Sequence, residues 1–415
     1  MKPSSTENRI TYEEHQQQKT AGQEESRQSN PLRCLTPGNI SAGVISGTLA
    51  MTGPPMIILE AAARGNFTQE QTIGWMFAVY VFGGLFSILM PLWLRIPVTW
   101  AHSISGVAFL VTVTSQFSYP QLIGGYVMSG LLILFVGITG IFSRIIQWVP
   151  KEIIAAMLAG LVTSYVVRLV TAIQEMPVVG LASLLSFFAL TKWAKRIPAV
   201  IGAVAVGFAT LFLTHDLGVS TAQSGFVLPA VHQPEFSLLG FFTLAVPLSL
   251  LILSNDAAPG IGALETCQFK PPITRIITIS GLSSIAAGLF GGQSANIAGM
   301  MTSICADEEA GEKQKRYMAS VISGVLILFF GVFAWWLVPF IQALPSVFVT
   351  MLAGLALIGV LGTSLQAGFG SSRHRLGAIF AFAIALSNVS FLHVSAPVWA
   401  LIAGALVAKG VEGEK

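Results

Sequence analysis

Long apolar stretches separated by short polar or charged breaks make up the chain after residue 35. Because a membrane-spanning helix needs roughly 20 mostly apolar residues, cutting the sequence at charges, prolines and glycine pairs yields fourteen candidate segments. The first seven cover residues 36–62, 70–94, 97–115, 121–147, 150–172, 176–192 and 197–214. The second seven cover residues 238–266, 272–290, 291–306, 316–340, 345–366, 374–391 and 394–410. The pattern predicts an all-α polytopic membrane protein with fourteen transmembrane segments.

The composition is typical of a chain whose solvent is lipid. Of the 415 residues, 53% are hydrophobic and 10% are charged, which is more apolar surface than a soluble domain can bury. The net charge of +3 is small and the basic residues are scattered, so we expect no nucleic-acid partner. Residues 1–35 are polar and lack the apolar core of a cleavable signal, which predicts a disordered cytoplasmic tail.

Lysine and arginine fall almost entirely on one side of the predicted arrangement. With both termini in the cytoplasm, 20 of the 22 basic residues lie in the tail, in cytoplasmic loops or at cytoplasmic helix ends. Only Arg64 and Arg168 fall on the opposite side. Because basic residues accumulate in cytoplasmic loops, this division favours fourteen spans. It predicts a multi-pass protein of the bacterial inner membrane with both termini inside.

The two halves of the chain resemble each other at a nearly constant offset. Residues 135–137 recur as 329–331, and the five letters of 157–161 recur unchanged at 351–355, both after 194 positions. Seven spans is an odd number, so the second half enters the membrane from the opposite face. We therefore predict an inverted-topology repeat, which is a frequent architecture of secondary transporters. Its two units cover residues 36–214 (spans one to seven) and 236–410 (spans eight to fourteen).

The third and tenth spans resemble ordinary helices least. Residues 97–106 begin with proline and are rich in polar and β-branched side chains, and residues 291–299 are their repeat counterpart. Prolines and polar residues also interrupt the first span at 52–55 and the eighth at 254–260. Extended backbone at membrane depth must be buried in protein or line a cavity. Broken segments at matched positions therefore indicate a transport site near the middle of the membrane.

Two acidic residues inside predicted spans are candidates for proton coupling. Asp256 lies in the interrupted eighth span, where a carboxylate is costly unless it is neutralised, paired or hydrated. It could take a proton from one side and release it to the other, or it could be a structural carboxylate bonded to freed backbone donors. Glu60 lies toward the outer end of the first span, where interfacial water could instead solvate it as an ordinary charge.

The broken segments also carry the candidate substrate-binding side chains. They supply one imidazole and several small polar groups: His102, Ser103, Ser105, Asn255, Gln293, Ser294 and Asn296. The histidine could shuttle a proton or contact an anion, or be held neutral by a carbonyl, and small polar residues also join packed helices without any ligand. Arg168 has Glu175 seven positions further on, so we expect it to snorkel beside that carboxylate. The alternative is an anion-collecting role on the outer side.

Several motifs, taken in order, resemble the benzoate:proton symporter family, which is related to the nucleobase and sulfate permeases. The likeness extends over residues 36–410 and is carried by residues 95–98, 155–160, 258–261, 291–292, 296–298, 304–305, 316–317 and 351–357. The resemblance implies a core domain made of spans one to four and eight to eleven. It implies a gate domain made of spans five to seven and twelve to fourteen, and a substrate site between the half-helices of spans three and ten.

Proton-coupled uptake of a small organic anion, such as benzoate or another aromatic carboxylate, is the leading hypothesis for function. The alternative is a uniporter or channel-like carrier for a nucleobase-like or inorganic anion. A membrane enzyme is disfavoured because no loop has a His/Asp/Glu metal cluster or a nucleophile motif. We therefore expect no catalytic residues, metal or cofactor. The expected partners are the anion, protons and membrane lipid, with a homodimer through the gate domain as a further expectation.

Overall fold

The computed structural model describes residues 34–142, 150–194, 198–215, 227, 229–372, 374–387, 389, 391 and 396–412. The helices of the first half are α2 (Pro37–Thr52), α3 (Pro54–Arg64), α4 (Gln69–Leu94), α5 (Ile104–Val113), α6 (Tyr119–Thr139), α8 (Lys151–Glu175), α9 (Pro177–Trp193) and α10 (Ala199–Thr214). Those of the second half are α11 (Leu238–Gly240), α12 (Val246–Leu251), α13 (Ala258–Thr266), α14 (Ile273–Leu289), α15 (Gly299–Ala306), α16 (Tyr317–Val332), α17 (Ala334–Gln342), α18 (Ser346–Phe369), α19 (Arg375–Ser387) and α20 (Ala396–Gly410). The described residues also form two short strands, β1 (Trp100–Ala101) and β2 (Asn296–Ile297), together with several short 3-10 and π-helical segments.

Seven helical stretches among the described residues are long and apolar enough to cross a membrane, which makes this a multi-pass helical membrane protein. They are Pro37–Arg64, Gln69–Leu94, Tyr119–Thr139, Lys151–Glu175, Leu238–Thr266, Lys313–Val332 and Ser346–Phe369. Six shorter apolar helices lie at other positions where the sequence predicts spans. Fourteen crossings, the inverted repeat and the core and gate domains stay predictions. The predicted tail lies outside the described residues except for its last two positions, of which Cys34 is buried beside Tyr317 and Met318.

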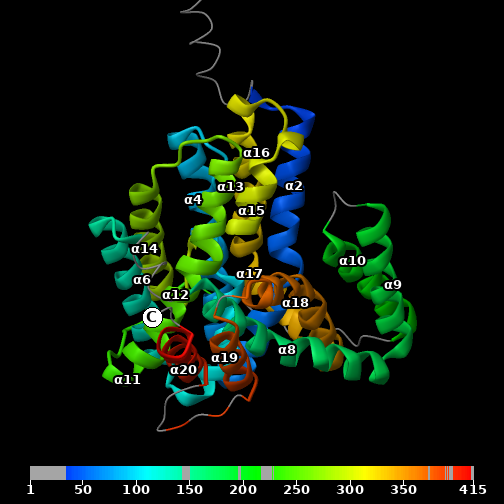
Figure 1. The fold of residues 1–415 in the computed structure, drawn as a ribbon. Coiled ribbons are helices and arrows are strands. Elements are labelled where there is room, and N and C mark those ends of the chain that lie inside the picture. The colour runs from blue at the N-terminus through cyan, green and yellow to red at the C-terminus, as the bar shows by residue number, and fades with distance from the viewer. Residues whose placement is uncertain are drawn as a thin grey trace, which may run out of the picture.

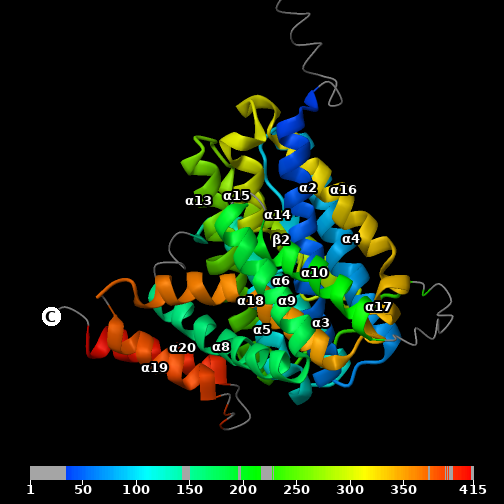
Figure 2. The ribbon, with the colours of Figure 1, turned by 90° about the vertical axis from the view of Figure 1, so that its right-hand side faces the viewer.

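Helices from the two halves pack against one another in pairs. Helix α4 packs on α16, α6 on α14 and α8 on α18, and Figure 1 shows α2, α4 and α16 side by side in the upper part of the molecule. Helices α9 and α10 pack together, as do α19 and α20 (Figure 2). Small residues permit the close approach: a Cβ at Gly84 of α4 would stand 2.5 Å from the backbone nitrogen of Leu328 on α16.

The predicted interruption at residues 52–55 separates two helices, whereas the one predicted at residues 254–260 does not. Helix α2 ends at Thr52 and α3 begins at Pro54, as the sequence predicts. The eighth span, by contrast, stays helical from Leu238 to Thr266. It accommodates Pro259 by widening into a π-helical turn over Ile252–Ala257 instead of breaking. Pro259 has no N–H to donate, and a widened turn absorbs that loss without ending the helix.

Candidate functional site

The non-helical parts of the predicted third and tenth spans meet at the centre of the fold. Strands β1 and β2 pair antiparallel, with Trp100 opposite Ile297 and Ala101 opposite Asn296. A further backbone bond runs from the Ala298 N–H to the Thr99 carbonyl (2.9 Å). The strands are buried, so every backbone polar group needs a partner inside the protein. The predicted broken segments are therefore extended, buried and in contact.

Serine hydroxyls on neighbouring helices form hydrogen bonds with backbone N–H and C=O groups that the two-residue ladder leaves unpaired. Ser87 of α4 accepts the Trp100 N–H (2.5 Å) and donates to the Trp100 carbonyl (2.7 Å). Ser280 of α14 accepts the Ile297 N–H (3.2 Å), and Ser283 donates to the Ala295 carbonyl (2.5 Å). The sequence analysis missed these serines. A signal was present, because Ser87 and Ser280 are 193 residues apart, which is close to the offset of the predicted repeat.

Two half-helices start at this strand pair. The chain leaves antiparallel strands in opposite directions, so α5 and α15 both have their N-terminal ends near the centre and run to opposite ends of the molecule. Ser103 caps α5 by accepting the Gly106 N–H (3.0 Å). Helix α15 begins after Ala298 without a side-chain cap. Its first N–H groups thus leave a partial positive charge at its N-terminus.

Asp256 lies beside both broken segments. Its π-helical turn contacts α5, α15 and β2, and the side chains of Ser103 and Asn296 are the neighbours of its carboxyl group. The approach depends on glycine, because a Cβ at Gly299 would stand 2.9 Å from the Asp256 carbonyl oxygen. Helix α13 follows directly, and a Cβ at Gly260 would meet the Ile297 side chain at 3.0 Å. The sequence-predicted acid therefore lies close to both broken segments.

The other predicted polar residues of the broken segments, apart from Asn255, are buried together around the strand pair, and we call this set the central network. His102, Ser103, Ser105, Gln293, Ser294 and Asn296 are each at most 4% exposed. The Ser103 N–H donates to Ser294 Oγ (3.1 Å), and the Ser103 and Ser105 hydroxyls are 3.1 Å apart. Gln293 accepts the Trp75 indole N–H (2.5 Å), a partner that the sequence analysis missed. Asn255 is half-buried and donates instead to Ser254 on its own turn (3.1 Å).

Several buried polar atoms of this network have no hydrogen-bond partner among the described residues. They are both ring nitrogens of His102, Asn296 Oδ1, Asp256 Oδ2 and Trp100 Nε1. A buried polar atom without a partner costs about 1–3 kcal/mol, so these atoms call for a further partner such as a water molecule, an ion or a polar ligand. The His102 ring lies edge-on to the Tyr80 ring, with centroids 5.0 Å apart. The arrangement combines hydrogen-bonding groups with an aromatic wall.

Glu60 does not belong to this network. Its Oε1 lies 3.2 Å from Arg64 on α3 and 3.2 Å from Arg168 on α8. The expected pairing of Arg168 with Glu175 is wrong, because seven helical residues correspond to a rise of about 10 Å. The carboxylate that meets Arg168 comes instead from a helix 108 positions away in sequence.

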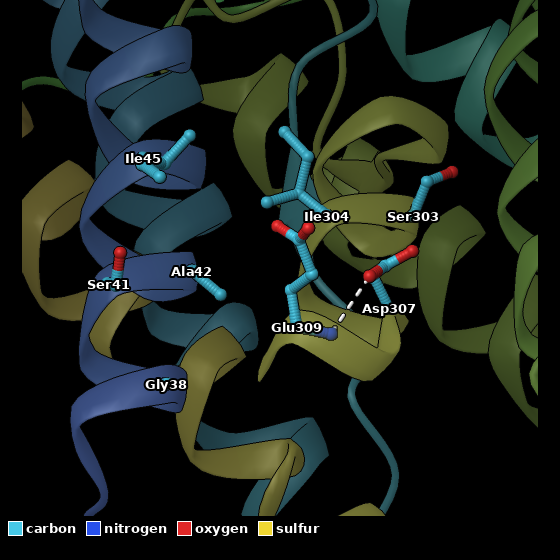
Figure 3. Close-up of a pocket in the computed structure, with 8 residues that line it drawn as sticks. All are labelled: Gly38, Ser41, Ala42, Ile45, Ser303, Ile304, Asp307 and Glu309. Atoms are coloured by element: carbon cyan, nitrogen blue, oxygen red, sulfur yellow. Dashed lines mark hydrogen bonds between the residues drawn. The ribbon is translucent and has the colours of Figure 1, made fainter. Parts of the chain in front are cut away.

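A cavity of about 650 Å³ lies at the end of α15 that is remote from the strand pair. It is lined by Gly38, Ser41, Ala42, Ile45, Ser303, Ile304, Asp307 and Glu309. Figure 3 shows Ala42 and Ile45 of α2 facing Ile304 and Glu309 across it. Helix α15 thus leads from the polar network at its first residue to this cavity at its last turn.

Known proteins resemble this chain over most of its length. Residues 34–409 match the family described as "Benzoate membrane transport protein". Inner membrane protein YdcO of Escherichia coli (strain K12) is 30% identical over 374 residues, which cover 90% of this chain and 95% of that protein. The benzoate membrane transport protein of Acinetobacter baylyi (strain ATCC 33305 / BD413 / ADP1) is 28% identical over 366 residues, which cover 88% of this chain and 93% of that protein.

Two solved structures share the fold at low sequence identity. The transmembrane domain of a cyanobacterium bicarbonate transporter, BicA, superposes with a TM-score of 0.60 at 17% identity and covers 89% of this chain and 97% of its own. The murine Slc26a9 anion transporter in its inward-facing state superposes with a TM-score of 0.57 at 12% identity and covers 90% of this chain and 68% of its own. These likenesses show the fold.

Proposed function

Because this chain belongs to the benzoate membrane transport protein family, we propose that it couples the uptake of a small aromatic carboxylate to protons. Its relatives are membrane transporters and not enzymes, and this chain is a membrane transporter of the same type. One observation carries the finer proposal. The Asp256 carboxyl lies beside Ser103 at the start of α5 and Asn296 just before α15, where a bound anion and a proton would meet.

The two half-helix N-termini provide the anion-binding end of the proposed site. A helix N-terminus favours negative charge through its free N–H groups and its dipole. Helix α15 has no side-chain cap, and His102 has both ring nitrogens without a partner among the described residues. In the proposal, the substrate carboxylate binds here and its ring packs on aromatic side chains such as Tyr80. Asp256 takes up the proton that enters with it.

Alternating access, in this proposal, is movement of a core domain against a gate domain. Helix pairing supports the underlying repeat: span two packs on span eleven as α4 on α16, and span four packs on span nine as α6 on α14. Exchanging the two halves converts one pair into the other, as a two-fold repeat requires. The basic residues support placing both termini in the cytoplasm. A homodimer through the gate domain is part of the same proposal.

Flux in proteoliposomes tests the proposed function. A proton gradient is expected to drive labelled benzoate inward. Protein-free liposomes measure the part of this uptake in which benzoate crosses the lipid as the neutral acid. Unlabelled aromatic carboxylates should compete, whereas nucleobases and bicarbonate should not. Saturable benzoate flux without proton movement would support the uniporter alternative, and competition by nucleobases or bicarbonate alone would reject an aromatic carboxylate as substrate.

Replacing Ser103 with alanine should weaken both the fold and the site. The variant loses the α5 cap, which is worth about 1 kcal/mol, and the hydroxyl beside Asp256. Unfolding in detergent and benzoate affinity measure the two losses separately. Thr68→Ala is the matched control, because Thr68 caps α4 at an exposed end and its hydrogen bonds are to Gln71 and Thr72 of the same helix. It should lower stability by a similar amount and leave affinity unchanged. Equal affinity in Ser103→Ala and wild type would remove Ser103 from the site.

A further inference from the structure

A second, smaller cavity lies at the opposite end of the molecule from the cavity of Figure 3. Its volume is about 160 Å³, and it is lined by Arg64, Thr112, Gly160, Leu161, Ser164, Tyr165, Arg168, Ala385 and Leu386. Thr112 is in the last turn of α5, so the cavity lies at the far end of the half-helix that begins at Ser103. The ten residues of α5 correspond to about 15 Å between the cavity and the central network.

Two guanidinium groups meet a single carboxylate at this cavity. Arg64 and Arg168 each lie 3.2 Å from the same oxygen of Glu60, Oε1. The other oxygen, Oε2, is buried and has no hydrogen-bond partner among the described residues. Two positive charges therefore face one negative charge, and the cluster of Arg64, Arg168 and Glu60 has a net charge of +1.

The arginines have unused capacity for another anion. Each guanidinium has five N–H donors in a rigid fork, and Glu60 takes one donor from each. Neither pairing is the two-bond arrangement in which arginine binds a carboxylate most strongly. The Arg168 side chain is 48% exposed whereas that of Glu60 is 15% exposed, so an anion in solution can reach the arginine without first displacing protein.

The ion pair also joins two parts of the fold that are proposed to move relative to one another. Glu60 is on α3 in the proposed core, and Arg168 is on α8 in the proposed gate. An anion that binds Arg168 through two N–H groups would compete with Glu60 for it and weaken the contact between these helices.

We propose that this cavity is an outer anion site, at which a small organic carboxylate binds Arg168 and Arg64 in place of Glu60 and thereby releases α3 from α8. The proposal rests on the proposed function, because the same anion then continues along α5 to the central network. It assigns to Arg168 and Arg64 a binding role on the approach path, distinct from the role of Asp256.

Equilibrium binding of labelled benzoate to the purified full-length chain tests this inference. Wild type should bind two molecules per chain. Arg168→Gln should weaken one of the two sites by at least about tenfold, which is the effect expected for the loss of a charge-assisted pair of hydrogen bonds. Arg168→Lys keeps the charge without the fork and should show an intermediate loss. Arg275→Gln is the matched control, because Arg275 is an exposed arginine over Trp93, and it should retain both sites.

The outcomes separate the outer site from the central one. A single benzoate per chain that Arg168→Gln does not affect, but Ser103→Ala weakens, would overturn the outer site and leave the proposed function standing. Binding that is lost in Arg168→Gln but unaffected by Ser103→Ala would support the outer site and overturn the central one. A wild-type chain that binds no benzoate would overturn both.

Discussion

Asp256→Asn is expected to abolish the accumulation of benzoate by a proton gradient while exchange of labelled for unlabelled benzoate continues. Asparagine has nearly the shape of aspartate and keeps hydrogen bonds with Ser103 and Asn296 within reach, but it cannot carry a proton. With one proton per substrate, a gradient of one pH unit supports about tenfold accumulation, or about 1.4 kcal/mol. In the variant, the initial rate at which benzoate accumulates should fall to that of protein-free liposomes, in which only the neutral acid crosses.

The matched control for this change is Glu265→Gln. Glu265 is on the same helical stretch, nine residues further on, and is exposed to solvent. It should accumulate benzoate as wild type does. If Asp256→Asn accumulates benzoate under a proton gradient faster than protein-free liposomes do, Asp256 does not carry the coupled proton.

Gly299→Val is expected to eliminate transport and to destabilise the protein by about 1–3 kcal/mol, the usual cost of overpacking a close contact. A Cβ here would stand 2.9 Å from the Asp256 carbonyl oxygen and 3.2 Å from Pro259 Cβ. The valine side chain would force α15 away from the turn that carries Asp256, and the carboxyl would lose its place beside Asn296. Thermal unfolding with and without benzoate, together with flux, measures both effects.

Gly262→Val controls for the change of residue type, because nothing lies within 4 Å of a Cβ at Gly262. It is on α13, the helix that packs against α15. It should keep most of the wild-type flux. Wild-type flux in Gly299→Val would mean that the close contact between α15 and the Asp256 turn is not required for transport.

The sequence predicted those parts of the site whose conformation depends only on nearby residues in the chain. Proline at 97 and paired glycines at 291 and 292 disfavour helix whatever surrounds them, and the structure is extended just after both. The eighth span was harder, because whether proline breaks a helix or widens it depends on the helices packed around it. Local sequence also could not identify the partner of Arg168, since Glu60 reaches it only when α3 and α8 both pack against α5.

The central strand pair has a consequence for biosynthesis. Ala101 receives its backbone partner, Asn296, only after 195 more residues have been added, which takes about 10–40 s at common rates of protein synthesis. Through that interval Ser87 is the group that can cover the exposed edge at Trp100. The first half of the chain is therefore synthesised with the backbone of β1 still lacking its partner strand, and the folding of this centre is complete only when the second half is present.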